Sequence, residues 1–113
     1  MMQSANAVRS RVDLVFNALG DPTRRAIVAQ LGKGPQSVST LSRPLGVTVT
    51  AVSQHIRVLE RCGMLTTKKV GRVRTCQLDS AGLDALDGWI RETRAIWERR
   101  LDRLAEILAE DDS

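Results

Sequence analysis

The stretch that decides the fold is "AVSQHIRVLERCGML", residues 51–65. At about 100° per residue, the apolar side chains in and just before it fall within one arc of a helix, and they are Val49, Val52, Ile56 and Leu59. Polar side chains occupy the opposite arc and its edges, and they are Thr50, Ser53, Gln54, His55, Arg57 and Arg61. Thr48 is a suitable N-cap, and Gly63 is suited to end the helix. The pattern predicts a half-buried helix over residues 48–61.

Three shorter helices are expected before this one. Residues 8–19 place apolar side chains at helical spacing, and Asp21-Pro22 then begins a second helix that ends at the glycines after residue 31. Residues 37–45 read as a third helix, and Gly46-Val47 makes a tight turn into the helix at 48–61. Two short helices joined by such a turn are typical of a helix-turn-helix.

A hairpin is expected after it. Residues 65–78 are rich in Thr and Val around a central glycine, Gly71, which favours two strands and a turn. Four cations cluster at the tip of this hairpin, and they are Lys68, Lys69, Arg72 and Arg74. The fold class is therefore mainly α with a small β-hairpin wing.

The last helix, over residues 80–108 and capped by Ser80, is long for a domain of this size. Its apolar stripe comprises Leu83, Leu86, Ile90, Trp97, Leu101, Leu104 and Leu108. A helix of about 28 residues measures about 42 Å, so it overhangs the body and leaves its stripe exposed. The simplest partner is a second copy of the chain. The ends, residues 1–7 and 109–113, are expected to be loose.

Charge is divided unevenly along the 113 residues. The formal net charge is +4, but residues 1–79 hold 12 Lys and Arg against 4 Asp and Glu, whereas residues 80–113 hold 5 against 9. A solvated surface with uneven charge is one interpretation, and a polyanion partner for the basic part is the better one. Scarce aromatic residues argue against stacking platforms for single-stranded nucleic acid.

Several classes of protein are excluded or disfavoured. The first ten residues lack the apolar run of a signal peptide, and no segment approaches 18 uncharged apolar residues, so we expect a cytoplasmic protein without a membrane span. The sole histidine has no Cys or Ser partner at a recognisable spacing, and no Gly-rich phosphate loop is present. An enzyme is therefore not expected.

The outer face of the helix at 48–61 has the chemistry to read double-stranded DNA. Gln pairs in bidentate fashion with adenine and Arg with guanine in the major groove, and Ser and Thr bind base edges or phosphates. The hairpin cations would lie along the backbone or minor groove beside the helix. A polar surface helix is the alternative, and the adjoining cationic hairpin favours DNA.

Three runs carry a family resemblance: "LGDPTRRAIVAQL", "LSRPLGVTVTAVSQHIRVLERCGML" and "KVGRVRTCQL". Together they resemble the ArsR/SmtB family of winged-helix transcriptional repressors, and the tail "WIRETRAIWERRLDRLAEIL" is similar to its branch with a long C-terminal helix. The resemblance implies a winged helix-turn-helix body over 8–79, a dimerisation helix over 80–108 within the same domain, and a homodimer built from the first and last helices. It implies repression, often of the protein's own gene or of nearby genes, from a pseudo-palindromic operator. The residues that match the recognition helix and the wing are Thr48, Thr50, Ser53, Gln54, His55, Arg57, Lys68, Lys69, Arg72 and Arg74.

The chain departs from the metal-sensing members of that family. Residues 37–45 contain no Cys and the last helix contains no His, so neither a metal site nor another cofactor is expected. Cys62 and Cys76 are interpreted as small buried residues, although a thiol switch stays open. A winged helix that docks to another protein and does not bind DNA directly is the alternative function, and the sequence does not identify an inducer.

Overall fold

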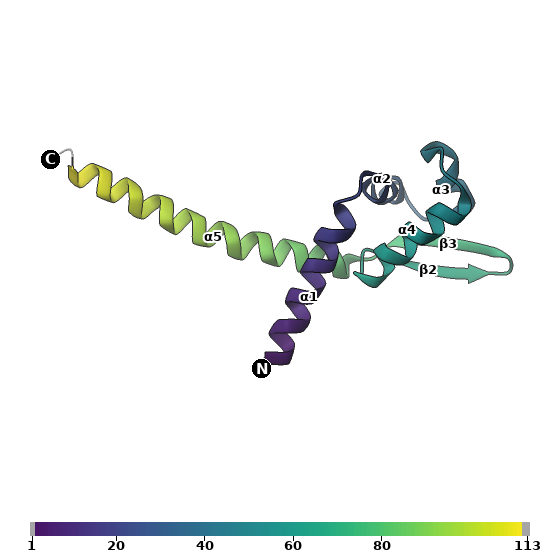
Figure 1. Cartoon of the computed structure of the whole chain (residues 1–113), viewed down its shortest axis with the longest axis horizontal. Helices are drawn as coiled ribbons and strands as arrows, with labels where there is room; N and C mark the ends of the chain where they lie inside the picture. The colour runs from purple at the N-terminus through teal and green to yellow at the C-terminus, as the bar shows by residue number, and fades with distance from the viewer. Residues whose placement is uncertain (1, 112–113) are drawn as a thin grey trace.

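The structure is a computed structural model that describes residues 2–111, with the side chains of residues 11–110. In chain order its elements are α1 (Met2–Leu19), α2 (Pro22–Leu31), β1 (Gln36–Ser37), α3 (Val38–Leu45), α4 (Val49–Arg61), β2 (Leu65–Val70), β3 (Val73–Leu78) and α5 (Ser80–Asp111). Figure 1 shows a small body of α2, α3, α4 and the hairpin, which α1 and α5 leave in different directions. The principal extents of the chain are 72 × 35 × 20 Å because α5 projects far beyond the body. None of the described helices combines the length and the apolar character needed to cross a membrane.

The ends that were expected to be loose continue the first and last helices over most of their length. Residues 2–7 belong to α1 and residues 109–111 to α5. Neither segment contains Gly or Pro, so nothing in the sequence ends the helices earlier. Residue 1 and residues 112–113, which were part of the same expectation, lie outside the described residues.

The capping residues begin the helices where the sequence predicts, with one correction. Asp21 Oδ1 accepts the backbone N–H groups of Thr23 (2.8 Å) and Arg24 (3.1 Å), and the bond from Arg24 is the main reason that the pKa of Asp21 lies below its ordinary value. At the start of α5, however, the cap is Asp79, whose Oδ1 accepts the N–H of Ala81 at 3.2 Å, and Ser80 is already helical. An Asp carboxylate is a strong N-cap, so the helix starts one position earlier than a Ser80 cap implies.

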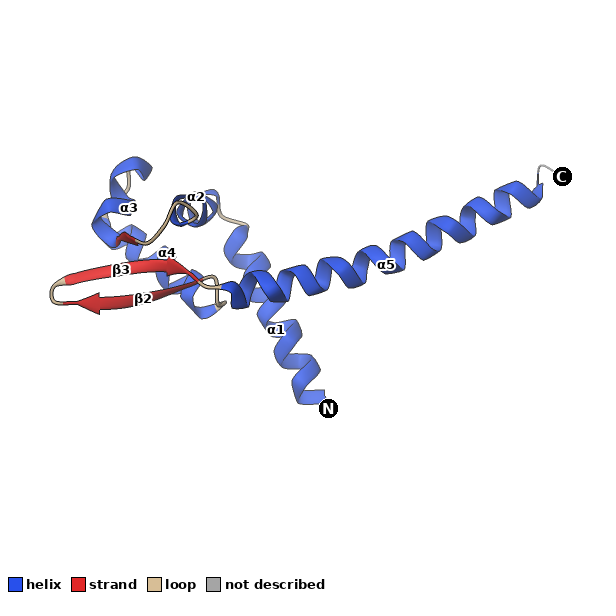
Figure 2. Ribbon diagram, turned by 180° about the vertical axis from the view of Figure 1, so that it is seen from behind, coloured by secondary structure: helices blue, strands red, loops and turns tan. Residues whose placement is uncertain are grey.

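The sheet has three antiparallel strands in the order β1–β3–β2 (Figure 2). The hairpin of β2 and β3 turns at Gly71, which adopts the left-handed conformation at φ 63°. Strand β1 was not predicted, because two residues are too few to show an alternating pattern. It pairs Gln36 with Cys76 and Ser37 with Thr75, so it fixes the start of α3 against the hairpin.

The core lies between the helices and the base of the hairpin. Its buried members include Val15 and Ala18 of α1, Ile27 and Leu31 of α2, Leu41 of α3, Val52, Ile56 and Leu59 of α4, and Met64, Leu65 and Cys76 around the sheet. The apolar arc of α4 is thereby confirmed at three of its four positions. Val49 is the exception, since 49% of it is exposed. The first turn of α4 extends past the edge of the core, so Val49 stays exposed even though it lies on the apolar side of the helix.

The start of α5 is held tightly to the body. Gly82 donates its N–H to the carbonyl of Gly63 at 2.8 Å, and a Cβ at Gly82 would lie 2.9 Å from both the Cys62 carbonyl oxygen and Met64 Sδ. Further along, the ring of Trp89 meets that of Phe16 of α1 edge-on, with centroids 5.0 Å apart. These contacts set the direction in which α5 leaves the body.

Candidate nucleic-acid interface

The outer face of α4 is open to solvent. Thr50, Gln54, Arg57 and Arg61 are exposed, while Val52, Ile56 and Leu59 on the opposite side are buried. Burial of that apolar side fixes the helix in rotation, so its polar side chains point away from the body. Gln54 and Arg57 therefore offer bidentate groups on a rigid element, which is what base recognition in a major groove needs.

The N-terminal end of α4 is capped by its own chain. Thr48 Oγ1 accepts the backbone N–H of Ala51 at 3.1 Å, and Gly46 ends α3 just before it in the left-handed conformation, at φ 64°. Thr48 is exposed, so its hydroxyl can still donate to a phosphate. The remaining free N–H groups of the first turn carry the positive end of the helix dipole.

The pairing register divides the cations of the wing between its two faces. Lys69 pairs with Arg74, so their side chains share one face, whereas Lys68 pairs with Thr75 on the other. The face of Lys69 and Arg74 also carries Thr67, whose hydroxyl donates to the carboxylate of Glu60 on α4 at 3.2 Å. Lys69 and Arg74 therefore lie on the side of the sheet that faces α4, and Lys68 does not.

A groove of about 290 Å³ opens where α3, α4 and the wing meet. It is lined by Ser37, Val38, Ser39, Val49, Ser53, Arg72, Val73 and Arg74. The described residues of this lining include two guanidinium groups and three hydroxyls but no carboxylate. Ser37 is also the N-cap of α3, and its Oγ accepts the N–H of Thr40 at 3.1 Å. Such a lining suits an anion with several acceptor oxygens, such as a phosphate.

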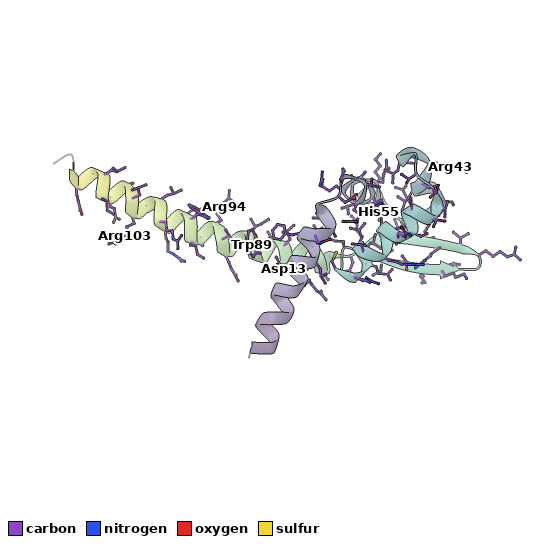
Figure 3. All side chains as sticks on the ribbon, in the orientation of Figure 1. Asp13, Arg43, His55, Trp89, Arg94 and Arg103 are labelled. Carbon is purple, nitrogen blue, oxygen red and sulfur yellow. The ribbon has the colours of Figure 1, made fainter. Side chains whose placement is uncertain are left out.

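The structure does not place all ten predicted residues together. Thr50, Gln54 and Arg57 form the open face of α4, and Ser53, Arg72 and Arg74 line the groove beside it. His55 lies elsewhere: it is half-buried, with Nδ1 at 3.4 Å from Nη1 of Arg24 on α2. Figure 3 shows His55 within the helical body and Arg43 at the outer end of α3.

Some residues of the site were missed by the sequence analysis. Ser37 and Ser39 were not among the predicted site residues, and their place in the groove depends on the unpredicted strand β1. Arg43 is exposed in the last turn of α3. The sequence feature that could have indicated Arg43 is its position in the first helix of the helix-turn-helix, because that helix lies next to the recognition helix in this motif.

The two cysteines belong to the core and not to the site. Both are buried free thiols, and burial raises the pKa of each. Cys62 Sγ also donates to the carbonyl of Leu59 at 3.3 Å. Their interpretation as small buried residues is confirmed. Among residues 2–111, no group of three or more His, Cys, Asp or Glu side chains comes together as a metal site.

Comparison with known proteins identifies helix-turn-helix transcriptional regulators as relatives of this chain. A family profile described as a helix-turn-helix domain matches residues 19–68. The HTH-type transcriptional regulator Rv2034 of Mycobacterium tuberculosis is 40% identical over 96 residues, which is 85% of this chain and 87% of that protein. Among solved structures, an ArsR-like transcriptional regulator from Rhodococcus sp. RHA1 superposes with a TM-score of 0.79 at 33% identity, over 89% of this chain and 95% of that one. The crystal structure of an ArsR family transcriptional regulator gives a TM-score of 0.75 at 38% identity, over 80% and 93%.

Proposed function

This chain belongs to the ArsR/SmtB family of winged helix-turn-helix transcriptional regulators, and we propose that it is a homodimer that binds a pseudo-palindromic operator and represses its own or adjacent genes. The observation that carries the proposal is the open polar face of α4, continuous with a cationic groove that the α3 N-terminus and the wing complete. Helix α4 would lie in the major groove, with Gln54 and Arg57 at the base edges.

The groove beside α4 would hold a backbone phosphate. Arg72 and Arg74 supply charge, and the hydroxyls of Ser37, Ser39 and Ser53 supply donors. Contacts of this kind set the register of the protein on the duplex without reading the sequence. Lys69, on the same face of the wing as Arg74, would continue this contact along the strand, and Lys68 would reach the backbone or minor groove from the other face.

The dimer is proposed because α1 and α5 leave apolar side chains uncovered. Those on α5 are Leu83, Trp89, Ile90, Ile96, Trp97, Leu101, Leu104, Ile107 and Leu108, and those on α1 are Leu14 and Phe16. So many exposed apolar side chains on two adjacent helices are typical of an interface. Two copies related by a two-fold axis would present two α4 helices to half-sites about 10–10.5 base pairs apart, or a multiple of that.

Repression would follow from occupancy, since a bound dimer excludes other proteins from the same DNA. An inducer, where one acts, must bind the free and the DNA-bound arrangements unequally, by about 1–3 kcal/mol for useful coupling. A change in the packing of α1 on α5 would alter the distance between the two α4 helices of the dimer, and this is the route by which an inducer would act.

The test is a footprint and a gel shift of the purified full chain on the DNA upstream of its own gene. We expect protection of two half-sites and an affinity that falls steeply with salt, because each neutralised phosphate releases counterions. Equal affinity for the upstream fragment and for scrambled DNA of the same length would overturn sequence-specific binding.

A second candidate is a winged helix that docks to a protein. Val70 and Val73 at the wing tip are 65% and 53% exposed, and apolar anchors of this kind are typical of a protein contact. Replacing Val70, which does not line the groove, with Thr distinguishes the candidates. Specific DNA binding that Val70→Thr leaves unchanged supports the DNA-binding function, whereas a chain that binds no duplex and loses regulation in the cell with Val70→Thr would support protein docking.

A further inference from the structure

Glu60 is the only acidic residue in the segment 22–78, which contains ten Lys and Arg residues. It lies in the last turn of α4, where the carbonyl groups form the negative end of the helix dipole and disfavour a carboxylate. It also belongs to the helix that we propose for the major groove, where the phosphates of DNA would repel it. A residue that is unfavourable on both counts indicates a compensating function.

The carboxylate of Glu60 is bound to the wing. The hydroxyl of Thr67 on β2 donates to Oε2 at 3.2 Å and lies 3.3 Å from Oε1. Among the described residues this is the only side-chain hydrogen bond between α4 and the hairpin of β2 and β3. Within the same part of the chain Glu60 forms no ion pair, although Arg57 and Arg61 lie within one turn of it. Glu60 therefore joins the wing to α4 without neutralising a cation that DNA binding would use.

This contact lies near the base of the wing, and the cationic groove lies further out. Helix α4 runs along the hairpin, with its first turns beside the outer part of the wing and its last turn beside the base (Figure 1). Ser53 of α4 and Arg74 of β3 both line the groove, and Thr67 lies on the same face of the sheet as Arg74, one row closer to the base. No side-chain hydrogen bond crosses the groove between α4 and the wing among the residues that the structure describes. The angle between the wing and α4 therefore sets the width of the groove.

Strand β2 is held less firmly than β3. Strand β3 is central in the sheet, with β1 on one side and β2 on the other, whereas β2 is an edge strand. The first residue of β2, Leu65, is buried in the core, and residues 68–70 are exposed. In the described part of the chain, Thr67 is the outermost residue of β2 with a side-chain hydrogen bond to α4. Its bond to Glu60 thus limits the movement of the exposed end of the wing.

We propose that Glu60 is a positioning residue: through Thr67 it holds the wing at the angle at which Arg74 contacts a DNA phosphate while α4 lies in the major groove. A wing that is held at this angle before binding reduces the cost of ordering it in the complex. The inference rests on the proposed function, and it adds a residue that acts on DNA binding without touching DNA.

Two substitutions of equal charge test the proposal on the footprinted operator fragment. Glu60→Gln and Glu60→Ala each remove one negative charge, so long-range attraction alone would make both variants bind DNA more tightly. The amide carbonyl of Gln still accepts the Thr67 hydroxyl, whereas Ala cannot. We expect Glu60→Gln to bind at least as tightly as the parent chain and Glu60→Ala to bind about three- to tenfold more weakly, because the wing must then be ordered on binding. Equal tightening in both variants would overturn the proposal.

The partner of the contact gives a second test without any change of charge. Thr67→Val removes the hydroxyl at nearly constant shape and should reproduce the loss seen in Glu60→Ala, while Thr67→Ser keeps the hydroxyl and should stay within about twofold of the parent chain. Combining Glu60→Ala with Thr67→Val should cost no more than the weaker-binding single variant, because both remove the same contact. Additive losses, or normal binding by Thr67→Val, would contradict the proposed role. A Glu60 that reads cytosine directly would instead leave Thr67→Val unaffected and change the base preference of Glu60→Gln.

The readout separates positioning from general stability. All variants are measured at a temperature where circular dichroism shows them folded, on the operator fragment and on scrambled duplex of the same length. Loss of positioning should lower the ratio of specific to non-specific affinity and make the salt dependence of operator binding shallower, because fewer phosphates are contacted. An unchanged ratio in both Glu60→Ala and Thr67→Val would reduce the contact to a structural one and overturn the inference. A parent chain that prefers no fragment would instead remove the proposed function itself.

Discussion

Arg24 joins the end of α1 to α4 by way of His55. Its Nη1 lies 3.4 Å from Nδ1 of His55, while Nε donates to the carbonyl of Ala18 at 2.7 Å and Nη2 to that of Asn17 at 3.1 Å. Those carbonyls belong to the last turn of α1, where carbonyls lack partners within the helix and a cation is favourable. A single guanidinium thus connects α1, α2 and α4. The proposed dimer helix and the proposed DNA-reading helix are therefore mechanically linked.

The first prediction concerns this link. Arg24→Ala should lower the free energy of unfolding by about 1–2 kcal/mol, because it removes two charge-assisted hydrogen bonds, one of them partly buried. Urea denaturation followed by circular dichroism measures the change. Arg25→Ala is the matched control: Arg25 donates to the Leu19 carbonyl at 2.6 Å but is exposed, so its loss should cost less. Equal costs for the two variants would argue against a special role for Arg24.

The second prediction concerns the close approach of α5 to the body. Gly82→Ala should destabilise the fold by about 1–3 kcal/mol, because the new methyl group would meet backbone and Met64 Sδ at 2.9 Å. In Gly88→Ala the same methyl meets nothing within 4 Å, and helix propensity then favours Ala by up to about 1 kcal/mol. Thermal melts of the two variants, recorded at one protein concentration, should shift in opposite directions. A downward shift for both would mean that the helix is not held at Gly82 in particular.

The third prediction separates base reading from backbone attraction. Gln54→Ala should cost roughly 1–3 kcal/mol on the native operator and relax the preference at one base pair in each half-site. Lys69→Ala should weaken binding to all sequences alike and make the salt dependence shallower. Fluorescence anisotropy against a panel of operator variants at two salt concentrations measures both effects. Identical profiles for the two variants would contradict the assigned roles.

The fourth prediction uses the two faces of the wing. Arg74 lines the groove next to Ser53, whereas Lys68 projects from the opposite face of the same hairpin. Each neutral variant removes one positive charge, so a purely long-range attraction would make Arg74→Ala and Lys68→Ala equivalent. We expect Arg74→Ala to weaken DNA binding several times more, because a charge-assisted contact to a phosphate in the groove is lost. The comparison is made by anisotropy titration on one operator fragment.

Features that depend on residues close together in the sequence could be predicted, and features that depend on distant residues could not. Spacing and local capping are short-range, so the orientation of Gln54 and the caps at Asp21 and Thr48 follow from the sequence alone. The exposure of Val49 does not, because a helical wheel gives a direction and not the place where neighbouring elements end.

The parts that were not predicted need partners distant in sequence. Strand β1 exists only through its pairing with β3. The placement of Lys68 and Lys69 on opposite faces of the wing relative to α4 follows only once the pairing register of the hairpin is known. The place of His55 depends on Arg24, 31 residues earlier in the chain. Periodicity along one element carries none of this information.

The last prediction concerns pH and the buried thiols. Burial raises the pKa of both Cys62 and Cys76, so the folded state keeps them protonated at a pH where the unfolded chain loses the protons. Their contribution to stability is therefore complete below the unfolded pKa, about 8.5, and declines as the pH rises above it. The free energy of unfolding should fall between about pH 8 and 9.5, by at most about 1.4 kcal/mol per pH unit for each thiol. Cys62→Ala with Cys76→Ala should be less stable throughout but show a shallower slope, and urea titrations at several pH values measure both. An unchanged slope in the double variant would assign the decline to other groups.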